Sequence, residues 1–247
     1  MSISPNQNQQ RQAPSAFIAP QEGDDIAGHA HRQVIGWLGI ALPFVIWLLA
    51  GLRPIDRDAS WSRLDSISAY FHSGAVAAFV GVLVTLGVYL FAYQGYANSD
   101  NRWDRIAARV AGLCAVSVAL FPMQPDPGAC PNPQWMTEGV SHLHFGSAAL
   151  LFTTFACIAL FLFRKKSGTP TKAKRTRNAI YLACGLSIIG ALLFIVWQFI
   201  PKGEGEPAPA DIFWPEAVAI WAFGISWLVK GRADFTIKAA VRKLKPA

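Results

Sequence analysis

Six apolar stretches of about 20 residues each divide this sequence, and they constrain the fold more than any other feature. A helix of about 20 apolar residues is long enough to cross the hydrocarbon core of a bilayer, which is about 30 Å thick. Hydrophobic residues make up 53% of the chain and charged residues only 15%. We therefore predict an all-α fold, a polytopic membrane bundle of six transmembrane helices over residues 33–52, 74–96, 106–122, 143–163, 178–200 and 213–229.

The basic residues predict how this bundle is oriented. Eighteen of the 22 lysines and arginines fall in residues 1–32, 97–109, 164–177 and 230–247. Because insertion retains cationic segments on the cytoplasmic side, this asymmetry predicts that both termini are cytoplasmic, in a bacterial inner (plasma) membrane. Topology and anionic lipid account for the net charge of +7, so the expected partner is the lipid bilayer and not a nucleic acid.

Two tails flank the membrane domain in this interpretation. Residues 1–28 are polar and lack the apolar core of a signal peptide, so they are predicted to be a disordered cytoplasmic tail. Residues 29–231 form the six-helix transmembrane domain, and 232–247 form a basic cytoplasmic tail. Three of the four cysteines lie in predicted helices and only Cys130 lies in an outer loop, so no internal disulfide is expected.

Ionisable residues gather at the outer ends of the second, fourth and sixth predicted helices. These helices run in the same direction, so His72, His144 and Glu216 are expected at one level of the membrane. Such groups are costly at membrane depth and usually face a bundle interior or an aqueous cavity. Two imidazoles and a carboxylate form a zinc-type ligand set with a position left for water. The same set could transfer protons, or cap helix ends without any chemistry.

Helical spacing extends this candidate site. If the second helix continues back to about residue 62, then Asp65, Ser68 and His72 share one face of it. His142 is predicted to point away from the centre that His144 faces. We predict that His72, His144 and Glu216 bind the metal and that Ser68 or Asp65 orients the attacking water.

Two resemblances accompany these residues. The strings "SISAYFH" (66–72), "VSVALFP" (116–122), "HFGSA" (144–148) and "FGISWLVKG" (223–231) resemble bacterial six-span integral membrane proteins of unassigned function. In addition, Ser68-Ala-Tyr-Phe-His72 resembles the Ser-x-x-x-His element of alkaline ceramidases and adiponectin-receptor-type proteins, which are intramembrane zinc hydrolases. The aspartate and the late His-x-x-x-His pair of those families have no counterpart here, and those families have seven spans.

Three functions remain open at this point. The leading hypothesis is metal-dependent hydrolysis of a lipid amide or ester. A second is an electron carrier in which His72 and His144 are the axial ligands of haem b. A third is a transporter, sensor or accessory subunit without chemistry. The two chemical hypotheses require the histidine and glutamate side chains to converge on one cavity. Side chains that face lipid or headgroups separately would favour the third hypothesis.

Overall fold

A computed structural model describes residues 22–55, 61, 63–95, 102–124, 133–165, 171–200 and 211–233, with backbone only for 22–26. Every regular element in these residues is helical: α1 (Glu22–Leu52), η1 (Ser68–His72), α2 (Val76–Ala92), α3 (Arg102–Leu120), α4 (Glu138–Cys157), η2 (Ile158–Leu162), α5 (Lys172–Gln198) and α6 (Phe213–Lys230). The all-α prediction is confirmed for this part of the chain. The predicted tails fall mostly outside it, although α1 already begins at Glu22, within the segment expected to be disordered.

The lengths and compositions of the helices indicate a membrane protein. In the described residues, three helices are long and apolar enough to cross a membrane, namely Ala27–Leu52, Glu138–Leu162 and Lys172–Gln198. A shorter apolar helix spans Val76–Ala92. The remaining two, α3 and α6, have 19 and 18 residues.

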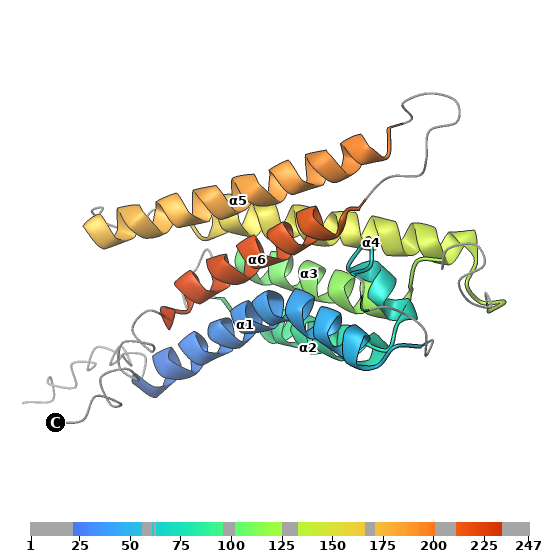
Figure 1. Ribbon diagram of the computed structural model, residues 1–247. Helices are drawn as coiled ribbons and strands as arrows, with labels where there is room; N and C mark the ends of the chain where they lie inside the picture. The colour runs from blue at the N-terminus through green and yellow to red at the C-terminus, as the bar shows by residue number, and fades with distance from the viewer. Residues whose placement is uncertain are drawn as a thin grey trace, which may run out of the picture.

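The α-helices form a closed ring. Each helix packs against the next one in the chain, and α6 returns to pack against α1. Because successive helices alternate in direction, the start of α1 and the end of α6 lie at the same end of the bundle, at the left in Figure 1. We call this the basic end, after Arg32, Arg164, Lys165 and Lys230. The opposite end, which carries η1, is called the η1 end.

Glycines allow the closest contacts between neighbouring helices. A methyl group added at Gly224 of α6 would lie 2.7 Å from the carbonyl oxygen of Gly36 in α1. One added at Gly112 of α3 would lie 2.6 Å from the carbonyl oxygen of Gly87 in α2. Small residues at such crossings let helix backbones touch, which is a main source of helix association in lipid.

Aromatic side chains fill the half of the ring nearer the basic end. Phe155 of α4 stacks on Phe223 of α6 with ring centroids 3.6 Å apart. Trp227 follows one turn later on α6, fully buried, and packs edge-on against Tyr93 and Phe163 at 4.9 and 5.2 Å. We call these rings the aromatic column.

The second predicted helix does not continue back to residue 62, contrary to the extension considered above, and α2 begins only at Val76. Residues Ser68–His72 form a separate 3₁₀ helix, and Ser73 is extended, with φ −123° and ψ 174°. The Ser73 hydroxyl donates to the carbonyl of Tyr70 and accepts from the N–H of Ala75, which offers the backbone an alternative to helix. Asp65, Ser68 and His72 therefore do not share one helical face.

Candidate functional site

A cavity of about 40 Å³ lies inside the ring, between η1 and the aromatic column. Its volume is sufficient for a few water molecules. The polar side chains of its lining are Ser68 and Glu216, both close to η1. The other lining residues are Leu42, Ile67, Phe79, Leu83, Leu86, Val118, Ala148, Leu151, Phe152, Phe155, Ile220 and Phe223. It is thus an apolar cavity with a polar side near η1.

Ser68 and His144 form a hydrogen-bonded pair at this polar side. His144 is buried, with 1% of its surface exposed, and its Nε2 lies 2.9 Å from the Oγ of Ser68. Its Nδ1 lies 2.8 Å from the carbonyl oxygen of Phe121. Because a carbonyl can only accept, Nδ1 must carry a hydrogen, and in the neutral imidazole Nε2 then accepts from the Ser68 hydroxyl. This is the arrangement in which an imidazole takes a proton from a nucleophilic hydroxyl.

The ends of two helices bring His144 to its partners. In α4, His144 shares the buried face with Ser141, Ser147 and Leu151, whereas His142 is exposed, as the spacing predicted. Helix α3 ends at Leu120, and Phe121 directly follows it. Carbonyl groups at a helix C-terminus lack partners within the helix, so the carbonyl of Phe121 is available to accept from His144.

Glu216 lies in the first turn of α6 and reaches the same cavity. Its Oε2 accepts a hydrogen bond from the backbone N–H of Ile67 at 2.6 Å. Ile67 immediately precedes Ser68, so the carboxyl group of Glu216 helps to position the serine.

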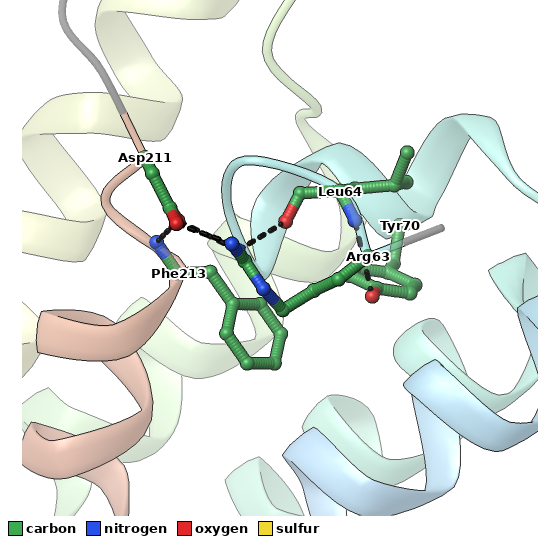
Figure 2. Close-up of polar contacts among 5 residues, drawn as sticks. All are labelled: Arg63, Leu64, Tyr70, Asp211 and Phe213. Carbon is green, nitrogen blue, oxygen red and sulfur yellow. Dashed lines mark hydrogen bonds and ion pairs between the residues drawn. The ribbon is translucent and has the colours of Figure 1, made fainter. Parts of the chain in front are cut away.

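A network around Arg63 joins the segment before η1 to the start of α6. The guanidinium of Arg63 donates to both carboxylate oxygens of Asp211, with Nη1 2.6 Å from Oδ1 (Figure 2). The backbone carbonyl of Asp65 accepts from Ile212 and Phe213 at 2.8 and 2.7 Å. The hydrogen bond with Asp211 raises the pKa of Arg63, so the guanidinium is charged throughout the physiological range. Residues 63–67 are thus fixed to α6 beside the cavity.

Tyr70 supports this segment from within. Its ring is fully buried, and its hydroxyl accepts from the backbone N–H of Leu64 at 3.3 Å (Figure 2). Burial raises the pKa of the Tyr70 hydroxyl because it disfavours the charged phenolate.

The structure brings together three of the five site residues predicted from the sequence. Ser68 and Glu216 line the polar side of the cavity, and His144 hydrogen-bonds to Ser68 there. His72 instead lies with its Nε2 2.8 Å from the carbonyl oxygen of Met123, and Asp65 is exposed. The carbonyl of Phe121 completes the site. The sequence did not predict this contact, because every residue has a backbone carbonyl and the residue type at position 121 does not reveal its role.

The described residues contain no group of three or more histidine, cysteine or acidic side chains arranged to hold a metal ion. The proposed zinc ligands His72, His144 and Glu216 each hydrogen-bond to protein groups instead. Zinc binding and haem binding therefore stay predictions.

A family model described as "Protein of unknown function (DUF998)" matches residues 68–230, which is more than half of the chain. The chain belongs to the DUF998 family. The DUF998 match begins at Ser68 and includes His144 and Glu216, so the Ser68–His144 pair and Glu216 all fall within it. All of α1 and the ion pair partner Arg63 precede the DUF998 region.

Membership in DUF998 fits the resemblance to membrane proteins of unassigned function. No finding supports the resemblance to alkaline ceramidases and adiponectin-receptor-type proteins. No curated protein and no solved structure matches the chain significantly.

Proposed function

We propose that this protein is a membrane-embedded acyl hydrolase that cleaves a lipid ester or amide, with Ser68 as the nucleophile and His144 as the general base. The observation that supports this proposal is the 2.9 Å hydrogen bond between Ser68 Oγ and His144 Nε2 at the wall of an apolar cavity. The remaining imidazole nitrogen is held by the carbonyl of Phe121 at 2.8 Å, which orients the ring. A nucleophile, a base and a group that orients the base are the elements of this chemistry.

The reaction would proceed in two steps. Ser68 Oγ attacks the acyl carbon while His144 Nε2 takes its proton; the bond to the leaving alcohol or amine then breaks, and that group receives the proton from His144. In the second step His144 takes a proton from water and the resulting hydroxide attacks the acyl-serine. The bond to Ser68 Oγ then breaks, which releases the acid, and His144 returns the proton to Ser68 Oγ. General-base assistance of this kind contributes about 10²- to 10⁴-fold.

The metal-dependent version predicted from the sequence would use some of the same residues. In that version His144 must give up its hydrogen bond with Ser68 or with Phe121 to bind the ion, because both of its ring nitrogens are engaged. Glu216 would bind the ion through Oε1 and keep the N–H of Ile67 on Oε2. A haem carrier would likewise require His72 to leave Met123. The serine mechanism uses the contacts already present, and for that reason we favour it.

We also infer that all six helices cross a bacterial inner membrane with both termini cytoplasmic. The ring supports this inference, because it places the start of α1 and the end of α6 at one end together with Arg164 and Lys165. Even α2, with 17 residues, is about 25 Å long at 1.5 Å per residue. That length is close to the thickness of the hydrocarbon core.

The proposal is tested with a fluorophosphonate probe, which forms a covalent bond with activated serines. We expect the purified full-length protein, in detergent or nanodiscs, to be labelled on the peptide that contains Ser68. Ser68→Ala should abolish labelling, and His144→Gln should slow it by about 100-fold or more, since the general base is lost. Ser147→Ala is the matched control, because Ser147 is another buried serine of the ring, hydrogen-bonded to Ser117 at 2.8 Å, with no imidazole partner.

Each alternative has its own result in this experiment. Unchanged labelling of Ser68→Ala, or no labelling of a folded wild type, contradicts the serine mechanism. Stoichiometric bound metal that is lost in His144→Ala would support the metal-dependent version instead. A haem absorption spectrum would support the electron carrier. Thermal unfolding of every variant separates a lost reaction from a lost fold.

A further inference from the structure

The cavity beside Ser68 extends along the inner faces of α4 and α6. Glu216 and Phe223 both line it, and Phe223 follows Glu216 by seven residues, which is about 10 Å along α6 at about 1.5 Å per residue. On α4, Leu151 and Phe155 line the cavity and follow the position of His144 by two and three turns. The cavity therefore runs from Ser68 and Glu216 towards the aromatic column.

Two stacked rings of the aromatic column stop the cavity at its other end. Phe155 and Phe223 are both buried, and their ring centroids are only 3.6 Å apart, so nothing fits between them. Trp227 packs behind Phe223 with ring centroids 6.1 Å apart and is itself fully buried. Closely packed interiors of this kind do not yield easily to an added group. A chain that enters beside Ser68 therefore ends at Phe155 and Phe223.

The volume of the cavity limits the length of such a chain. A dry apolar cavity of about 150 Å³ holds benzene, which corresponds to about 25 Å³ for each carbon. The cavity of about 40 Å³ then has room for about two carbons. A fatty acyl chain of about 16 carbons would need about ten times this volume on the same scale.

The lining of the cavity favours an alkyl group as its occupant. Apart from Ser68 and Glu216 at the polar side, the lining residues in the described part of the chain are apolar. An alkyl group gains free energy when apolar walls remove it from water, whereas a hydroxyl or amine without a hydrogen-bond partner loses it. The alkyl end of an acyl group suits these walls better than the leaving alcohol or amine does.

We propose that the substrate carries a short acyl group, acetyl or propionyl, whose alkyl end occupies this cavity while Ser68 attacks the carbonyl carbon. The bond to the leaving alcohol or amine breaks outside the cavity, and water then releases acetate or propionate from Ser68. This inference rests on the proposed function and adds the acyl length to it. Leu151, Ile220, Phe155 and Phe223 are the residues that set this length.

Hydrolysis of p-nitrophenyl esters by the detergent-solubilised full-length protein tests the acyl length. The value of kcat/KM should be highest for the acetate or propionate ester and about tenfold or more lower for hexanoate and octanoate. One methylene too many in a hydrophobic pocket already changes kcat/KM by about 10- to 200-fold. Hydrolysis that persists in Ser68→Ala is background and is subtracted.

Enlarging the cavity should lengthen the preferred acyl group. Leu151→Ala removes the carbons beyond Cβ from the wall, so it should raise the ratio of kcat/KM for hexanoate to that for acetate by about tenfold or more. Leu90→Ala is the matched control, because Leu90 is fully buried in α2 and does not line the cavity. Its ratio should equal that of wild type. All ratios are measured in one detergent, so the partition of longer esters into micelles cancels between variants.

Two results would overturn the inference and leave the serine mechanism standing: equal kcat/KM for acetate and octanoate in wild type, or the same ratio in Leu151→Ala and Leu90→Ala. No hydrolysis of any ester, together with no fluorophosphonate labelling, would remove the proposed function and this inference with it. If Leu151→Ala does not fold, Ile220→Val replaces it, with Ile188→Val in α5 as the control that does not line the cavity. A smaller rise of the same ratio is then expected for Ile220→Val alone, and its absence contradicts the inference.

Discussion

Arg63 and Asp211, which are 148 residues apart in the sequence, form a two-point ion pair that joins the segment before η1 to the start of α6 (Figure 2). The guanidinium also lies over the ring of Phe213, with its Cζ 5.0 Å from the ring centre. The pair therefore connects the α1–α2 and α5–α6 segments beside the cavity. It belongs to the same region in which Glu216 accepts from Ile67.

This ion pair should make a modest contribution to stability. Its side chains are 26% and 34% exposed, so solvent screens the charges, and a coupling energy of about 1 kcal/mol is expected. A double-mutant cycle of Arg63→Gln and Asp211→Asn, followed by chemical or thermal unfolding in detergent, measures this energy. Additive single-variant effects, with no coupling, would show that the two side chains do not interact in solution.

Substitution of the crossing glycines should be costly. Gly224→Ala places a methyl group 2.7 Å from the Gly36 carbonyl oxygen, and Gly112→Ala places one 2.6 Å from that of Gly87. Because these neighbours are backbone atoms, the helices must separate, and we expect each variant to lose about 1–3 kcal/mol in free energy of unfolding.

Gly190 of α5 is the matched control for this prediction. An added methyl group there would meet no atom within 4 Å, so Gly190→Ala should be neutral or gain about 0.5–1 kcal/mol from helix propensity. Equal losses at Gly190 and Gly224 would contradict the close-contact explanation.

Burial of Tyr70 should make the fold sensitive to alkaline pH. The unfolded chain releases the phenolic proton near pH 10, whereas in the folded chain burial raises the pKa of Tyr70 above this value. The unfolded state then binds fewer protons than the folded state, so the free energy of unfolding decreases as pH rises above about 10.

Comparison of wild type with Tyr70→Phe isolates this effect. The variant should lose less stability than wild type between about pH 9 and pH 11, since it has no phenol at this position to ionise. The measurement is the melting temperature at each pH. Parallel losses in the two proteins would assign the alkaline sensitivity to other groups.

The proposed orientation can be read from cysteine labelling in a chain whose four natural cysteines are replaced by alanine. Gln134→Cys introduces an exposed thiol at the η1 end, and Lys172→Cys introduces one at the basic end. In intact spheroplasts, a membrane-impermeant maleimide should label position 134 at once and position 172 only after permeabilisation. The reverse labelling pattern would show that the orientation in the membrane is opposite to the one we infer.

The general form of this protein could be predicted from its sequence because it depends on properties of single segments. An apolar run such as residues 178–200 must avoid water along its whole length, and α5 (Lys172–Gln198) duly forms one continuous helix. The buried face of α4 could also be predicted, since helical spacing alone separates His144 from His142.

The details of the site depended on contacts between distant segments, which no local pattern specifies. The break after η1 lies where Gly74 packs so closely on the carbonyl of Arg53 that a side chain would not fit, and His72, at the end of η1, contacts the carbonyl of Met123. Ser68 meets His144 across 76 residues of sequence, and the partner that orients the imidazole is a backbone carbonyl exposed by the end of α3. Hydrophobicity thus determined which segments became helices, whereas the directional hydrogen bonds of the folded ring decided which of their polar groups came together.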